Sequence, residues 1–143
     1  MVGEIAPDFT LKDQDGNEFN LYKELTSKIM LVFYPKDDSP VCTKQLNNYQ
    51  QNLGKFNNAG IKIIGINIDS ENSHKYFGNK CKLDFPLLVD TGKSVSKKFD
   101  ALNFVGINKR KIVIIDTDKR IIFEKVNFPF NFIRSEEILN PLN

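Results

Sequence analysis

The chain has 143 residues, enough for one domain with its own core, and a net charge of +2 with dispersed lysines, which predicts neither a nucleic-acid nor a membrane partner. Two cysteines and one histidine are too few for a disulfide scaffold and match no zinc spacing, so we expect no metal and no cofactor. No apolar run has the length of a signal peptide or a transmembrane helix, so we expect one soluble domain over residues 1–143, intracellular and cytoplasmic; a removed targeting segment would leave no trace.

The first predicted element is a hairpin. Phe9–Leu11 and Phe19–Leu21 are short strand-like runs on either side of Asp13–Asn17, which contains a glycine. This spacing predicts a hairpin with a loop of more than two residues. Residues 21–25 are expected to add one helical turn.

The next part predicts a strand, a helix and a second strand. Residues 29–34 are an apolar run of β-branched and aromatic residues, which is typical of a buried strand. Residues 61–69 form a second such run, so the two strands should be parallel with a right-handed crossover. Between them, five residues at steps of three and four predict one amphipathic helix that ends at Ala59–Gly60: Cys42, Leu46, Tyr49, Leu53 and Phe56.

The remainder predicts a second helix at 72–82, a short extended segment at 85–90, a third helix at 94–99, strands at 111–116 and 120–126 joined by a tight turn, and a last helix near Ser135. A parallel βαβ unit followed by an antiparallel pair favours a mixed central sheet with helices on both faces. The predicted class is therefore α/β, a thioredoxin-like fold with an N-terminal β-hairpin.

Cys42 has a position with chemical consequences. Ser39 is a candidate N-cap and Pro40 a candidate first helical residue, which places Cys42 in the first turn. The unpaired N–H groups and the helix dipole favour a thiolate there, and a thiolate is the nucleophilic form. The position also lies beyond the carboxyl end of a strand, where α/β proteins place active groups. The alternative is a small buried apolar side chain.

The segment around Cys42 resembles the active-site signature of peroxiredoxins: Tyr34-Pro35, then Ser39-Pro40-Val41-Cys42-Thr43. Three flanking stretches resemble the bacterioferritin-comigratory or Q-type group of that family: Ala6-Pro7-Asp8-Phe9, Tyr34-Pro35-Lys36-Asp37-Asp38, and Phe85-Pro86-Leu87-Leu88 with Asp90. Arg110, three residues before Val113-Ile114-Ile115-Asp116, falls where the family has its active-site arginine. The resemblance covers about residues 3 to 140.

The resemblance implies a thiol-dependent peroxidase, an antioxidant oxidoreductase with a redox-active cysteine. The Cys42 thiolate would attack hydrogen peroxide or an alkyl hydroperoxide and become a sulfenic acid. The Cys42 N–H, the Ser39 hydroxyl and the Arg110 guanidinium would stabilise the charge of the transition state, and Pro35 would wall the pocket. The plainer alternatives are a solvated Arg110 in the basic run 109–111 and a Pro35 that merely ends a strand.

Three positions depart from the family pattern. Gln45 stands where glutamate is common, which removes a carboxylate that could orient the arginine. Ser39 replaces the commoner threonine and keeps the hydroxyl. Asn47 stands where many Q-type members have a resolving cysteine, so a disulfide within this helix is excluded.

Cys81 is then the internal candidate for resolution by a disulfide with Cys42, which would require local unfolding of both helices. The alternative is a structural thiol beside Phe77, with an external thiol as the reductant. We interpret His74 and Tyr76 as structural.

The implied partners are a small-molecule peroxide and a reductant, which is thioredoxin, glutaredoxin or a low-molecular-weight thiol. We expect a monomer or a weak dimer. The alternative function is a non-catalytic thioredoxin-like redox-relay or binding module, for which Gln45 and Asn47 are the arguments. A dithiol oxidoreductase is disfavoured because Gln45 stands where the second cysteine of a C-x-x-C motif would be.

Overall fold

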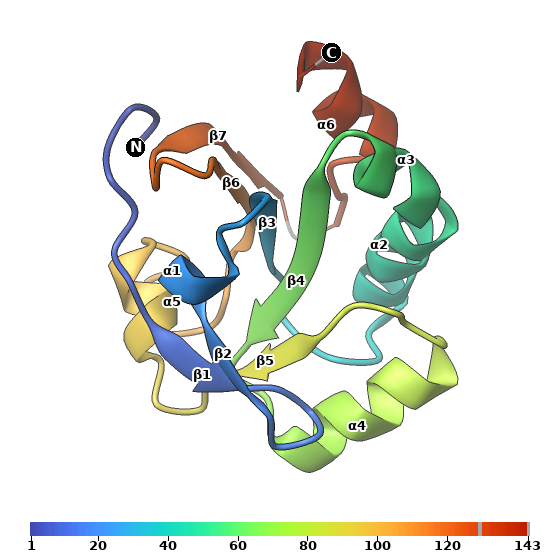
Figure 1. Ribbon diagram of the computed structural model, residues 1–143. Helices are drawn as coiled ribbons and strands as arrows, with labels where there is room; N and C mark the ends of the chain where they lie inside the picture. Colours follow the sequence, from blue (N-terminus) through green and yellow to red (C-terminus); the bar gives the residue numbers. More distant parts are fainter. Residues whose placement is uncertain (129, 143) are drawn as a thin grey trace.

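A five-stranded mixed sheet forms the middle of the molecule, with the strand order β5-β4-β3-β6-β7 (Figure 1). The computed structural model describes residues 1–128 and 130–142. Strands β3, β4 and β5 are parallel, and β6 is antiparallel to both β3 and β7. This confirms the predicted α/β class. The strands are β3 (Lys28–Phe33), β4 (Ile61–Asn67), β5 (Leu87–Val89), β6 (Arg110–Ile115) and β7 (Ile121–Asn127).

The predicted N-terminal hairpin is also present. Strands β1 (Thr10–Lys12) and β2 (Glu18–Asn20) are antiparallel and flank the loop at 13–17. The expected helical turn follows as α1 (Leu21–Glu24), capped by the Asn20 side chain. The other helices are α2 (Pro40–Gln51), α3 (Leu53–Asn58), α4 (Glu71–Lys80), α5 (Ser94–Lys98) and α6 (Ser135–Leu142).

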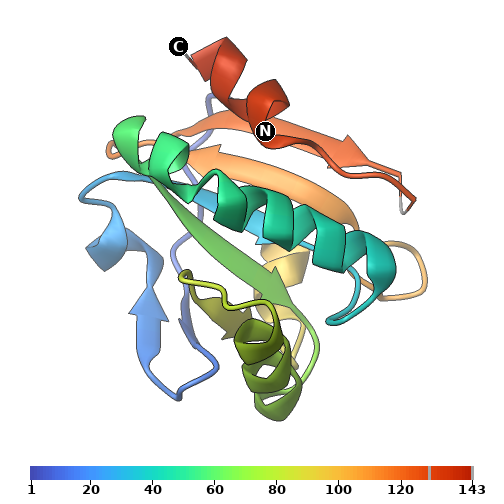
Figure 2. The ribbon, with the colours of Figure 1, turned by 90° about the vertical axis from the view of Figure 1, so that its right-hand side faces the viewer.

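The sheet separates two apolar cores, because alternate residues of its central strand β3 face opposite sides. Ile29, Leu31 and Phe33 pack with the hairpin, α1 and α5. Met30 and Val32 pack on the other side with side chains from α2, α3, α4 and α6. Figure 2 shows α2 and α3 lying across that second face, with α6 above them and α4 below. Cys42 belongs to this second core.

The structure corrects two helix predictions. The single helix expected from Pro40 to the stop at Ala59–Gly60 is two helices, because Asn52 leaves the helical path with ψ of 15° and its side chain donates to the Asn48 carbonyl at 2.8 Å. The spacing of apolar residues does not reveal such a break, because Phe56 is buried whether the helix is continuous or divided. Helix α4 ends at Lys80 rather than 82, so Cys81 is its C-cap.

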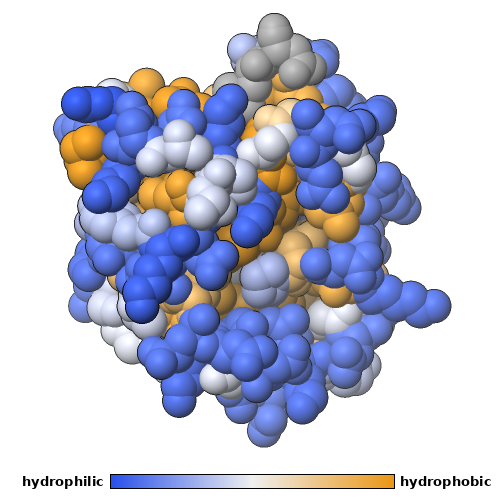
Figure 3. Space-filling view, in the orientation of Figure 1, coloured by the Kyte–Doolittle hydropathy of each residue, from blue (hydrophilic) through white to orange (hydrophobic). Residues whose placement is uncertain are grey.

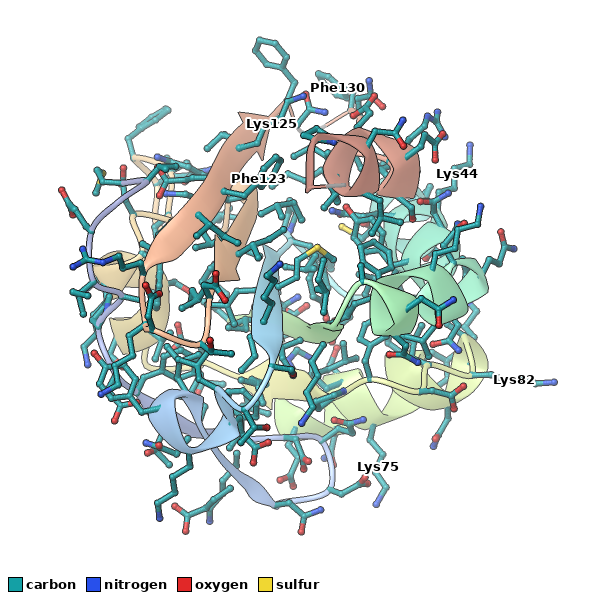
Figure 4. The ribbon with its side chains drawn as sticks, turned by 45° about the horizontal axis from the view of Figure 1, so that its top comes forward. Lys44, Lys75, Lys82, Phe123, Lys125 and Phe130 are labelled. Atoms are coloured by element: carbon teal, nitrogen blue, oxygen red, sulfur yellow. The ribbon has the colours of Figure 1, made fainter. Side chains whose placement is uncertain are left out.

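Hydrophilic side chains cover most of the face in Figure 3, and apolar ones reach the surface mainly in its middle. Lys44, Lys75, Lys82 and Lys125 are exposed and point away from one another into solvent (Figure 4), as expected for dispersed charge. Within residues 1–128 and 130–142, the helices all fall short of the length and hydropathy needed to cross a membrane.

Candidate active site

The first turn of α2 holds Cys42 at the end of a loop that follows β3. Ser39 is the N-cap: its hydroxyl oxygen accepts from the Cys42 backbone N–H at 3.4 Å, and Pro40 is the first helical residue. The predicted N-terminus is therefore confirmed. The Cys42 side chain is fully buried, and the first turn contains no acidic residue that would oppose a thiolate.

Arg110 reaches the same point from the other half of the chain. It is the first residue of β6, and the antiparallel pairing of β6 with β3 sets Lys111 opposite Phe33, at the end where the Cys42 loop begins. One guanidinium nitrogen, Nη1, lies 3.2 Å from the Cys42 sulfur. The residue as a whole is 4% exposed, so the alternative of a solvated Arg110 is wrong. The guanidinium is therefore in direct contact with the Cys42 sulfur inside the core.

Gln45 supplies the acceptor that its replacement of glutamate had put in doubt. Its Oε1 accepts from Arg110 Nη1 at 2.8 Å, so an amide oxygen takes the place of the expected carboxylate. Its Nε2 donates to the Tyr49 hydroxyl at 3.1 Å. Tyr49 was identified from the sequence only as a core residue, although the spacing of Cys42, Gln45 and Tyr49 by three and four already placed all three on one helix face.

The other two predicted residues lie in the loop. The Ser39 hydroxyl donates to the Lys36 carbonyl at 3.2 Å while it accepts from Cys42. A hydroxyl has one proton to donate, so a bond from Ser39 to a peroxide requires the bond to Lys36 to break. Pro35 is half-buried and follows Tyr34, whose side chain packs in the same core as Cys42.

A buried polar network that the sequence reading missed anchors this loop. Asp37 accepts from the Tyr34 hydroxyl at 2.5 Å and from the Ser73 hydroxyl at 2.7 Å, and its Oδ2 lies 2.6 Å from His74 Nδ1. The Asp37 backbone N–H donates to Asp69 after β4. The loop is thus fastened to the end of β4 and to α4, and the interpretation of His74 as a structural residue agrees with this geometry.

The protonation of this pair follows from its partners. His74 Nε2 lies 2.8 Å from the Leu88 carbonyl, which can only accept, so Nε2 carries a proton. Burial acts to raise the pKa of Asp37, but the hydrogen bond and charge of His74, with the bond from Tyr34, lower it below its usual value. An ionised Asp37 leaves Nδ1 as the donor, which makes the contact a buried ion pair.

Asp38 and Cys81 mark a second link between the loop and α4. The Asp38 carboxylate pairs with Lys80 Nζ at 2.6 Å on the surface, one residue before Cys81. Cys81 is half-buried, packs against the same core as Cys42, and is a free thiol, as is Cys42. Burial raises the pKa of Cys81, against the opposing charge of Lys80. The structure therefore places the two thiols on one face of the sheet without joining them.

Comparison with known proteins gives a family for this architecture. The model of the AhpC/TSA family matches residues 2–124. A chloroplastic peroxiredoxin Q from Arabidopsis thaliana is 46% identical over 95 residues, which are 66% of this chain and 44% of the relative. One from Suaeda salsa is 44% identical over 116 residues, 80% of this chain and 54% of the relative. The chain spans about half the length of these relatives.

Solved structures agree with the fold. Peroxidoxin BcpB from Mycobacterium tuberculosis superposes with a TM-score of 0.90 at 26% identity, covering 99% of this chain and 95% of that one. The bacterioferritin comigratory protein from Xanthomonas campestris, which was solved in a study of its alkyl peroxide reduction, gives a TM-score of 0.84 at 23% identity over 94% of this chain and 89% of that one.

Proposed function

The chain belongs to the AhpC/TSA family, and from this membership we propose that it is a thiol-dependent peroxidase with Cys42 as its peroxidatic residue. The observation that carries the proposal is the contact between Arg110 Nη1 and the Cys42 sulfur, at 3.2 Å in a buried site at a helix N-terminus. A structural cysteine needs no buried cation beside its sulfur, whereas a nucleophilic thiolate does.

In the proposed first step, the Cys42 thiolate attacks one oxygen of the peroxide. A sulfur–oxygen bond forms as the oxygen–oxygen bond breaks, and the leaving oxygen takes up a proton and departs as water or an alcohol. Cys42 is oxidised to the sulfenic acid, and the peroxide is reduced. In the transition state of this step, negative charge is shared among the sulfur and both oxygens, so a fixed donor beside them lowers the barrier.

Arg110 is suited to that role because its planar guanidinium presents several N–H groups at fixed angles. Nη1 already contacts the sulfur and Gln45 oxygen, which fixes the group before any substrate binds. The Ser39 hydroxyl and the Cys42 backbone N–H are further candidate donors to the peroxide, once the hydrogen bonds of Ser39 to Lys36 and Cys42 break. Pro35 is a candidate for the side chain that shields the pocket from water.

In the proposed second step, a thiol attacks the sulfenic sulfur, a disulfide forms and water leaves. Cys81 supplies that thiol only if the end of α4 opens, because burial raises the pKa of Cys81 and the bonds of His74 and Lys80 hold α4 against the Cys42 loop. Otherwise the thiol is external, from thioredoxin, glutaredoxin or a small thiol. We propose a monomer or weak dimer as the working form.

The alternative of a non-catalytic relay module loses its main argument, since Gln45 contacts Arg110 instead of leaving the site incomplete. The peroxiredoxin names of the relatives also favour the enzyme.

The test is stoichiometric. Reduced protein receives one equivalent of hydrogen peroxide, and free thiols and intact mass are determined for the wild type, Cys81→Ser and Cys42→Ser. Loss of both thiols with a mass decrease of two hydrogens in the wild type alone identifies Cys81 as the resolving residue. Gain of one oxygen in both wild type and Cys81→Ser identifies an external reductant. If the wild type loses no more thiol and gains no more oxygen than Cys42→Ser after the same exposure to hydrogen peroxide, the peroxidase proposal is wrong.

A further inference from the structure

Five buried residues form one continuous chain of hydrogen bonds from the Cys42 sulfur to the segment before α6. Arg110 Nη1 donates to Cys42 at 3.2 Å and to Gln45 Oε1 at 2.8 Å. Gln45 Nε2 donates to the Tyr49 hydroxyl at 3.1 Å, and Tyr49 donates to the Ile133 carbonyl at 2.5 Å. Cys42, Gln45 and Tyr49 have no exposed surface.

The direction of every bond in this chain follows from its last member. A carbonyl has no proton, so that of Ile133 can only accept, and the Tyr49 hydroxyl must donate its single proton to it. Burial raises the pKa of Tyr49, so the hydroxyl keeps that proton. The Tyr49 oxygen can then only accept, which turns the NH₂ group of Gln45 toward it and the amide oxygen toward Arg110.

An amide needs such a partner where a carboxylate does not. Either oxygen of a glutamate could accept from Arg110, but a glutamine whose amide turns by 180° presents N–H groups to the N–H groups of the guanidinium. In that orientation Gln45 and Arg110 share no hydrogen bond, and the facing N–H groups repel the guanidinium away from the Cys42 sulfur. Glutamine at position 45 therefore requires a neighbour that fixes its orientation.

Tyr49 is itself held firmly. Its ring packs edge-on against Phe56, with centroids 6.0 Å apart. The segment that contains Ile133 is fastened to α2 by Ser135, whose hydroxyl donates to the Asn48 side chain at 2.7 Å. Tyr49 and the carbonyl that accepts its hydrogen bond are thus both held in place against α2 and α3.

We propose that Tyr49 is a positioning residue that acts through the Gln45 amide to hold Arg110 beside the Cys42 sulfur. The inference rests on the proposed function, in which Arg110 stabilises the Cys42 thiolate. The Tyr49 hydroxyl bonds to Gln45 and to the Ile133 carbonyl, so its effect on Arg110 passes through Gln45.

The test measures the alkylation of Cys42 by iodoacetamide as a function of pH, with the Cys42 peptide quantified by mass spectrometry and no peroxide present. Tyr49→Phe removes one oxygen and should raise the midpoint by about 0.5–1 pH unit, a part of the 1–3 units that an adjacent opposite charge produces. Tyr22→Phe is the matched control: it also loses a hydroxyl bonded to a carbonyl, that of Ala6, but in the other core, and should leave the midpoint unchanged.

A second pair of variants separates positioning from a general structural effect. In a Gln45→Glu background the carboxylate needs no orientation, so adding Tyr49→Phe should shift the midpoint by less than about 0.2 unit. An equal shift in the wild-type and Gln45→Glu backgrounds, or none in either, overturns the inference. If Tyr49→Phe fails to fold, Gln45→Met takes its place, and a midpoint unchanged from wild type in that variant overturns the inference as well.

The two proposals fail independently. Alkylation reports the Cys42 thiolate whether or not the protein reduces peroxide, so a wild type that leaves peroxide intact refutes only the proposed function. If the protein reduces peroxide but Tyr49→Phe leaves the pH midpoint of Cys42 alkylation unchanged, only the positioning role is refuted.

Discussion

Removing His74 should cost the fold a large part of its stability, because His74 completes a buried ion pair. Its side chain is fully buried and that of Asp37 is 3% exposed. His74→Leu preserves the side-chain volume approximately but leaves the Asp37 charge without its cation and the Leu88 carbonyl without its donor. Loss of one partner of a buried pair costs about 3–5 kcal/mol.

The structure places the expected cost near the lower end of that range. Asp37 keeps the hydrogen bonds from the Tyr34 and Ser73 hydroxyls and from the Asn67 amide, which still stabilise its charge. We therefore expect His74→Leu to lower the free energy of unfolding by about 3 kcal/mol and the melting temperature by about 10 °C.

Urea titration followed by far-UV circular dichroism is the suitable assay, because the chain has no tryptophan. Lys75→Leu is the matched control, since it introduces the same residue at the next, exposed position of α4 and should change stability by less than about 0.5 kcal/mol. The double variant with Asp37→Asn should be less destabilised than the sum of the single variants, because it leaves no unpaired charge. A loss below about 1 kcal/mol in His74→Leu, or strict additivity, would refute the ion pair.

Three further outcomes are expected. Arg110→Met should raise the pH midpoint of Cys42 alkylation by about 1–3 units, and an unchanged midpoint would mean that the guanidinium does not act on the sulfur. Ser39→Ala removes the N-cap acceptor and should lower the free energy of unfolding in urea by about 1 kcal/mol; equal stability would contradict the cap. Because the pKa of Asp37 is lowered in the folded protein, its ionisation stabilises the fold. This stabilisation is complete at pH values above the ordinary pKa of 3.8 and is lost as the pH falls through the lower pKa of the folded state. The stability advantage of the wild type over Asp37→Asn in urea titrations should therefore be constant above about pH 4, shrink as the pH falls further, and vanish only below the folded pKa of Asp37. An advantage that grows with acid would show the opposite sign.

Local patterns predicted the elements that depend on neighbours in the chain. The Ser39 cap, the first-turn position of Cys42, the parallel strands and both hairpins follow from turn residues, capping and hydrophobic periodicity, which are short-range effects. The break at Asn52 escaped this reasoning because a side-chain bond to the Asn48 carbonyl competes with the helix without disturbing the apolar spacing.

The sequence by itself determined the fold class and the candidate set of Cys42, Ser39 and Arg110. Capping and strand patterns single out Ser39 and Cys42, and the resemblance to the family singles out Arg110. Only the tertiary structure decided how they are held. Gln45 and Arg110 are 65 positions apart, Tyr49 and Ile133 are 84 apart, and Asp37 and His74 are 37 apart. Whether a polar side chain finds its partner across such distances depends on strand order and register. These bring the start of β6 and the loop before α6 against α2, and helix α4 against the loop that precedes α2. Hydrophobic periodicity contains no information about these pairings, since it records which residues are buried and not which buried polar groups meet.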